Sequence, residues 1–176
     1  MIRGEIIIGL DQYLEIRKNE YRSKYYKDKG CKMNLEYPKD ITEFIPDPAD
    51  LRISRQTNYE VGYWSKANQI HNWYMQNCAD KDEYGIPIDD CKPVEITVDK
   101  LEKLLDDCKK VLADHSLASS LLPTKNGFYF GSVDYDEDYF REIERTIEII
   151  EPVLKFAKHK LEIEDYIWEV YYRASW

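Results

Sequence analysis

Residues 61–74, Val-Gly-Tyr-Trp-Ser-Lys-Ala-Asn-Gln-Ile-His-Asn-Trp-Tyr, contain the change from strand to helix that decides the fold. Apolar and polar residues alternate over residues 51–63, which predicts a strand because successive strand side chains face opposite ways. Ala67, Ile70, Trp73 and Tyr74 then recur at the spacing of one face of a helix. The hydroxyl of Ser65 can accept from unpaired backbone N–H groups, so we expect this residue to cap a helix that runs to about Asn77.

Three further segments favour strands. Residues 6–16 alternate in polarity, residues 94–97 are Val-Glu-Ile-Thr, and residues 166–172 are rich in β-branched and aromatic side chains. The Lys- and Tyr-rich stretch up to Tyr26 either extends the first strand as a hairpin arm or turns helical. Strands at both ends with helices between them predict an α+β domain. We expect the terminal strands to be neighbours in a small, mostly antiparallel sheet, with about three helices on one face.

Two longer helices are predicted in the second half of the chain. The clearest spans residues 98–114, after a possible cap at Thr97, and its apolar stripe consists of Leu101, Leu104, Leu105, Cys108, Val111 and Leu112. A capping-box pattern, Asp134-x-x-Glu137, precedes a long amphipathic helix. Pro152 should kink or break that helix, since proline costs about 3 kcal/mol in a helix interior.

Length and composition indicate one folded domain. The chain has 176 residues, 43% of them hydrophobic and 14% aromatic, which suits a single domain, residues 1–176, with a buried core. Residues 27–50 contain three prolines and should form a flexible loop. The four cysteines lack a C-x-x-C pair, which favours reduced thiols. No apolar run is long enough to span a bilayer. We therefore expect a cytoplasmic protein without a membrane segment and without a cofactor.

The charge distribution bears on the partner. The net charge is −9, with +3 on residues 1–35 and −12 on the remainder. Non-specific nucleic-acid binding requires basic side chains that displace counterions, so we do not expect it. An acidic body is instead suited to occupy a basic groove on another protein.

The candidate binding site consists of polar and aromatic residues that neither the strand period nor the helical period explains. His71 would share a helix face with Ala67, where a lone histidine is usually a hydrogen-bonded structural residue. The sharper hypothesis is a pocket shared with Asp11, Asp89 or Asp90, because a carboxylate orients an imidazole in general-base and metal sites. The candidate binding residues are Asp11, Tyr13, Trp64, Lys66, Asn68, His71, Trp73, Asp89, Asp90, Tyr129 and Arg173. No residue is assigned as catalytic or as a metal ligand.

Two of these candidates have a simpler interpretation. Asp11 interrupts an apolar strand, where it either faces water or has a partner such as Lys66 or Arg173. Residues 128–132 are expected to form a packed aromatic turn rather than a base-stacking platform. The acidic run at 134–138 lacks the spacing of a calcium loop, and the chain has no common hydrolase or NTPase motif.

Five motifs occur in a specific order: Gly9-Leu10-Asp11-Gln12-Tyr13-Leu14, Val61 to Trp73, Asp89-Asp90-Cys91, Leu121 to Ser132, and Tyr171-Tyr172-Arg173-Ala174-Ser175-Trp176. As a set they resemble a family of uncharacterised proteins encoded by bacteriophages and prophages. The similarity covers the chain except residues 1–8 and about 18–50. The resemblance implies a phage or mobile-element origin and action in a bacterial cytoplasm.

Three functions are compatible with these features. The leading hypothesis is a non-catalytic protein that binds a host protein, specifically a nucleic-acid-binding nuclease of an antiviral defence system such as a CRISPR effector. The second is a binding module for a nucleotide-like ligand, with Trp64, Trp73 or Tyr129 stacking on a base and Lys66 and Arg173 meeting phosphate. The third is an enzyme of unfamiliar type that uses His71 and an aspartate. The oligomeric state is left open by the sequence.

Overall fold

The computed structural model describes residues 9–22, 53–164 and 167–176. Within them a four-stranded antiparallel sheet is formed by β1 (Asp11–Arg22), β2 (Ile53–Ser65), β3 (Val94–Glu95) and β4 (Trp168–Ser175), in the order β2-β1-β4-β3. The first and last of these strands are neighbours along β1 from Asp11 to Lys18, as predicted.

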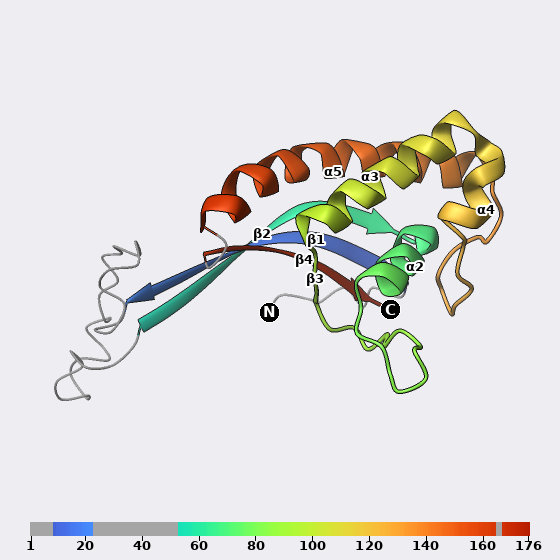
Figure 1. Ribbon diagram of the computed structural model, residues 1–176. Helices are drawn as coiled ribbons and strands as arrows, with labels where there is room; N and C mark the ends of the chain where they lie inside the picture. The colour runs from blue at the N-terminus through green and yellow to red at the C-terminus, as the bar shows by residue number, and fades with distance from the viewer. Residues whose placement is uncertain (1–8, 23–52, 165–166) are drawn as a thin grey trace, which may run out of the picture.

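The helices cover one face of this sheet (Figure 1). They are α2 (Asn68–Asn77), α3 (Val98–Ala113), α4 (Ala118–Leu121) and α5 (Glu137–Glu164), with a 3₁₀ turn, η3 (His115–Leu117), before α4. The two longest, α3 and α5, pack against each other over the sheet, and α2 lies at the end where β2 finishes. The predicted α+β class and the one-sided helix layer are therefore confirmed.

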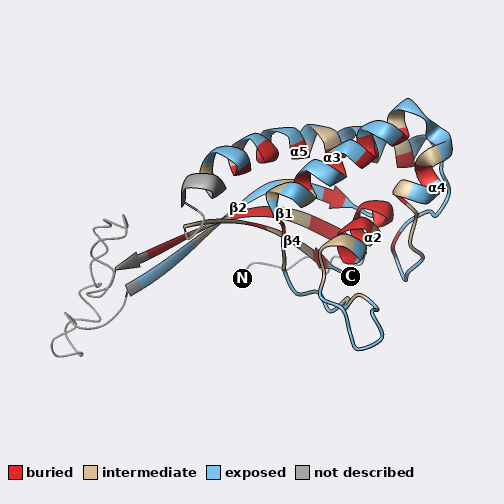
Figure 2. Cartoon of the chain, in the orientation of Figure 1, coloured by how far each residue is buried: buried red, intermediate tan, exposed pale blue. Residues whose placement is uncertain are grey.

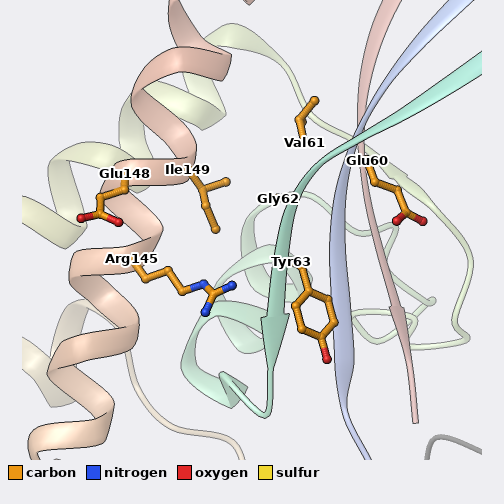
Figure 3. A pocket seen from close by; sticks show the side chains of 7 residues that line it. All are labelled: Glu60, Val61, Gly62, Tyr63, Arg145, Glu148 and Ile149. Carbon is orange, nitrogen blue, oxygen red and sulfur yellow. The ribbon is translucent and has the colours of Figure 1, made fainter.

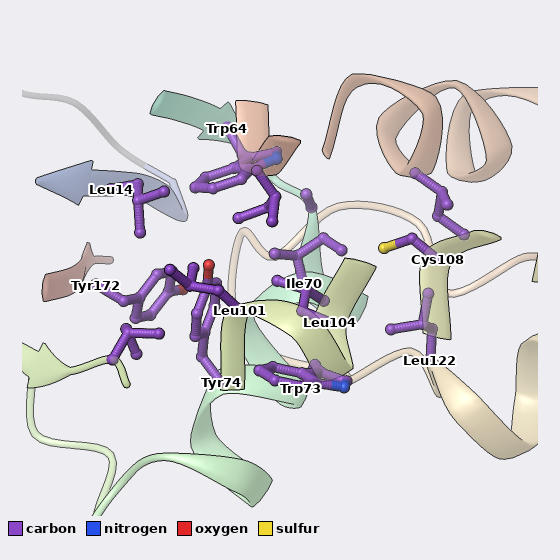
Figure 4. Close-up of a cluster of buried hydrophobic side chains, with 14 of the residues drawn as sticks. Leu14, Trp64, Ile70, Trp73, Tyr74, Leu101, Leu104, Cys108, Leu122 and Tyr172 are labelled. Carbon is purple, nitrogen blue, oxygen red and sulfur yellow. The ribbon is translucent and has the colours of Figure 1, made fainter. Parts of the chain in front are cut away.

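The core lies between the sheet and the helices (Figures 2 and 4). Leu14 and Trp64 from the sheet meet Ile70 and Tyr74 of α2, and the Tyr74 ring stacks on Tyr172 with 4.0 Å between centroids. The predicted stripe of α3 is buried at Leu101, Leu104, Cys108 and Val111, whereas Leu105 and Leu112 are half-buried at its margin. The helical period thus located this face correctly.

A β-bulge alters the phase of β2. Leu14 pairs with Gly62 and Glu15 pairs with Glu60, so Val61 is the extra residue. Side chains that pair across strands share a face, and consequently Tyr63 lies on the face opposite the helices. Gly62 faces α5, where an added Cβ would lie 2.4 Å from Cγ2 of Ile149. Only glycine permits the helix to approach the strand this closely.

The element boundaries differ from expectation near both ends of the first two strands. The strand predicted at 6–16 begins at Asp11 and continues to Arg22, so the arm is extended rather than helical as far as that residue. Ser65 ends β2 and does not cap α2, which begins at Asn68 after Ala67 without a side-chain cap. Lys66, at φ 61°, makes the turn between them. Residues 6–8, the continuation to Tyr26 and the predicted loop 27–50 lie outside the described residues.

The long helix, α5, differs from the sequence prediction in its N-terminal cap and in its continuation beyond Pro152. The carboxylate of Asp136, not Asp134, accepts from the backbone N–H of Tyr139 at 3.0 Å. Pro152 was predicted to kink or break the helix; the helix runs through it to Glu164, so a break is excluded. Ile150 and Val153 flank the proline and are buried. Burial of two such side chains is worth about 1.5–3 kcal/mol each, which offsets the cost of the proline. None of the described helices is long and apolar enough to cross a membrane.

Candidate functional site

His71 lies at the centre of a buried chain of hydrogen bonds. Nδ1 of its ring is 2.8 Å from the Tyr172 hydroxyl, and Nε2 is 3.1 Å from Oδ2 of Asp89. The Tyr172 hydroxyl donates to Oε1 of Gln12 at 3.0 Å, and Nε2 of Gln12 donates to the Ala67 carbonyl at 3.2 Å. The chain joins α2, the two central strands and the loop after α2.

The direction of these bonds is determined from one end. A carbonyl oxygen can only accept, so the Gln12 amide nitrogen must face Ala67, and its oxygen then accepts from Tyr172. That bond uses the single hydrogen of the phenol, whose oxygen therefore accepts from Nδ1–H of His71. Nε2 faces a carboxylate and must also donate. With every bond made, both ring nitrogens of His71 have a partner, Nδ1 at the Tyr172 hydroxyl and Nε2 at the Asp89 carboxylate.

Asp89 is contacted by two side chains that favour its ionised form, His71 and Lys125. Nζ of Lys125 lies 2.5 Å from the same oxygen that His71 contacts. Burial by itself would raise the pKa of the Asp89 carboxyl, but the hydrogen bonds from His71 and Lys125 outweigh it and place the pKa below its ordinary value of 3.8. The Tyr172 phenol, fully buried, has a pKa raised well above 10.0 and stays a neutral donor. Oδ1 of Asp89 is buried and has no hydrogen-bond partner among the described residues, so the network is satisfied except at that atom.

Aromatic rings enclose the imidazole. The rings of Phe130 and Trp176 stand edge-on to it, with centroids 5.4 and 5.2 Å away. His71 has 0% of its surface exposed, and the hollow beside it measures about 10 Å³, close to the space that one water molecule needs. A substrate could not reach either ring nitrogen in this arrangement.

The other polar residues of the aromatic stretch hold loops in place. Asn68 donates to the carbonyls of Phe130 and Ser132, at 3.1 and 2.7 Å, and accepts from the backbone N–H of Lys125. Its side chain therefore supplies partners to three backbone groups of the 125–132 loop. The indole of Trp73 donates to Asp107 of α3 at 2.8 Å.

The opposite face of the sheet carries a second cluster. Asp11 is buried and accepts from the Tyr63 hydroxyl at 2.5 Å, so its partner is neither water nor the predicted Lys66 or Arg173. Arg173 instead donates to Glu15 at 2.9 Å and stacks over the Tyr13 ring at 4.2 Å. Although burial opposes it, contact with Arg173 and a second arginine lowers the pKa of the Glu15 carboxyl.

The structure thus divides the predicted site residues. It brings His71 and Asp89 together, whereas Asp90 pairs with Lys92 at the surface. Trp64 and Trp73 are buried in the core. In the predicted packed turn only Phe130 is buried, since Tyr129 is exposed and Phe128 is 80% exposed. That expectation was correct for one ring of three.

Three partners of the network were missed in the sequence. Gln12 and Tyr172 occupy alternate positions on neighbouring strands, and strand period alone would place both on the core face. Lys125 reaches Asp89 from a loop without a local signal. Among the described residues, no cluster of three or more His, Cys, Asp or Glu side chains has the arrangement of a metal site.

Comparison with known proteins adds no relative. No family model matches the chain, and neither the curated proteins nor the solved structures contain a significant match. The resemblance to phage-encoded proteins therefore stays a prediction.

Proposed function

We propose that the protein is a non-catalytic binding protein that docks on a protein of the bacterial host. The observation that supports this most is the contrast between its enclosed histidine and its exposed aromatic rings. His71 has no free nitrogen and no exposed surface, whereas large rings project into solvent at Tyr59, Tyr63, Tyr84, Phe128, Tyr129 and Trp176. Exposed aromatic side chains supply rigid contact area at protein interfaces.

The charge of the chain directs the proposal to one class of partner. A protein with net charge −9 is repelled by nucleic acid and attracted by the basic surfaces that bind it. A nuclease of an antiviral defence system presents such a surface, and the resemblance to phage proteins provides a reason to block it. The proposed action is occupation of that surface, without bond making or breaking.

For each of the two alternative functions, the structure buries residues that the proposed site would need at the surface. A nucleotide binder would need rings that a base can reach, but Trp64 and Trp73 are buried and only Tyr129 of the three is exposed. An enzyme based on His71 would need access to the imidazole, which Phe130 and Trp176 close off.

A pulldown tests the proposal. The tagged protein is incubated with bacterial lysate, and bound proteins are identified by mass spectrometry and retested as purified components for inhibition of nuclease activity. We expect a nuclease whose cleavage is inhibited at stoichiometric amounts. Turnover of a substrate by the purified protein, lost on His71→Ala, would instead establish the enzymatic alternative.

A further inference from the structure

Among the residues that the structure describes, no strand pairs with the outer edge of β2. In the strand order β2-β1-β4-β3 its one neighbour there is β1, and the register between them is unbroken from Ile53 to Glu60. An edge strand presents a row of backbone N–H and C=O groups that another extended chain can pair with. Natural edges are commonly protected by charged side chains, proline or a β-bulge. β2 contains no lysine or proline, its Arg55 is paired with Glu20, and its bulge at Val61 follows the regular run of residues 53–60.

The exposed apolar side chains of β2 lie near its C-terminal end, after the polar run of residues 54–58. Tyr59, Val61 and Tyr63 are 47%, 37% and 41% exposed. Because of the bulge at Val61, the two tyrosines project to opposite faces of the sheet. A chain added at this edge would therefore find an aromatic ring on each side of it.

A groove between β2 and α5 adjoins the same edge (Figure 3). It measures about 670 Å³ and is lined by Glu60, Val61, Gly62, Tyr63, Arg145, Glu148 and Ile149. Ile149 closes its floor against Gly62. The Arg145 side chain extends from α5 toward the strand, as Figure 3 shows, and makes no hydrogen bond or ion pair with any residue that the structure describes.

The Arg145 guanidinium acts electrostatically on Glu142 of the same helix without a hydrogen bond to it, so its donors indicate what the edge would bind. The neighbouring arginine on α5, Arg141, is paired with Asp138 at 2.6 Å, so Arg145 stands out on its helix. A guanidinium binds carboxylates through two parallel hydrogen bonds. A second copy of this chain is a poorer occupant, because two bodies of net charge −9 repel each other.

We propose that the free edge of β2 is a docking site for an extended segment of a partner protein, which adds as a further strand beside residues 54–60 and places an Asp or Glu side chain on Arg145. Main-chain hydrogen bonds would provide affinity, and the arginine would select the sequence, as in other cases of strand addition. This inference rests on the proposed function, since it names the contact by which the partner is held.

Selection from a yeast-displayed library of random decapeptides tests the site without knowledge of the partner. Wild-type protein should enrich alternating sequences that share Asp or Glu at one position, and these peptides should bind Arg145→Glu at least tenfold more weakly. The Arg145→Glu protein should itself select Lys or Arg at that position. Val61→Lys, which protects the edge, should also weaken binding at least tenfold, whereas Arg141→Glu, one turn away on α5, should bind as wild type does.

Circular dichroism and thermal unfolding confirm that each variant is folded, which the exposed positions lead us to expect. The proposal is overturned if no peptide is enriched, or if enriched peptides bind Arg145→Glu and Val61→Lys as tightly as wild type. A dimer in analytical ultracentrifugation that Val61→Lys abolishes would assign the edge to a second copy and equally overturn it. If lysate pulldowns retain the same partner with both variants, this docking site fails while the proposed function stands; an empty wild-type pulldown contradicts the proposed function instead.

Discussion

Replacing Asp89 with Asn should destabilise the protein by about 2 kcal/mol at pH 7, because a hydrogen bond to a charged group contributes about 1.5–3 kcal/mol and the amide removes the carboxylate that the buried His71 contacts. The contact with Lys125 adds little, since that side chain is about one-third exposed. For a chain of this size each kcal/mol lowers Tm by about 2–4 °C, so the expected decrease is about 4–8 °C.

The pH dependence of this effect follows from the lowered pKa of Asp89. A carboxyl whose pKa is lower in the folded state stabilises that state at every pH above its ordinary value of 3.8. The stabilisation is lost as the pH falls from 3.8 through the folded pKa, because the wild-type carboxyl then becomes protonated as well. The difference between wild type and Asp89→Asn should therefore shrink as the pH falls below 4.

Urea unfolding followed by tryptophan fluorescence measures this difference at pH 7, 5, 4 and 3. The matched control is Asp90→Asn, which changes the adjacent carboxylate, paired only with the exposed Lys92, and should alter stability by less than about 0.5 kcal/mol. Equal stability of Asp89→Asn and wild type at pH 7 would refute the ion-pair assignment. A difference as large at pH 3 as at pH 7 would refute the electrostatic explanation of it.

Three further substitutions probe the packing. Gly62→Ala should cost about 1–3 kcal/mol in urea unfolding, since its methyl group meets Ile149, and adding Ile149→Ala should recover part of that loss in a double-mutant cycle. Asn68→Ala should cost about 2–4 kcal/mol and increase hydrogen exchange in the 125–132 loop, because backbone groups lose their partner. Trp73→Phe should cost about 1–3 kcal/mol in thermal unfolding, since the indole hydrogen bond to Asp107 is lost; an unchanged Tm would contradict its role.

The sequence predicted what periodicity can encode. The β-branched and aromatic residues of β4 and the apolar stripe of α3 located two elements, and the stripe also located the side of α3 that packs, because that face must leave water. The bulge at Val61 adds one residue to β2 and leaves no sign in the amino-acid composition. A regular strand period would therefore place Tyr59 and Tyr63 on the same face of the sheet, whereas in the structure they lie on opposite faces. The pairing of His71 with Asp89 was one of three options, and only the loop after α2 decided among them.

The composition of α2 explains why the most aromatic stretch contributes so little exposed surface. Most of this helix is buried, so its polar side chains need partners, although the Tyr74 hydroxyl has none among the described residues. The side chains of Asn68 and Asn72 bond to the loop after α4, and that of His71 bonds to the loop after α2. The loops in turn carry the exposed ring of Phe128. Substitutions in α2 should therefore reduce the stability of the fold and partner binding together. Changes at Arg145 should reduce partner binding alone. This difference separates residues that support a recognition surface from residues that form it.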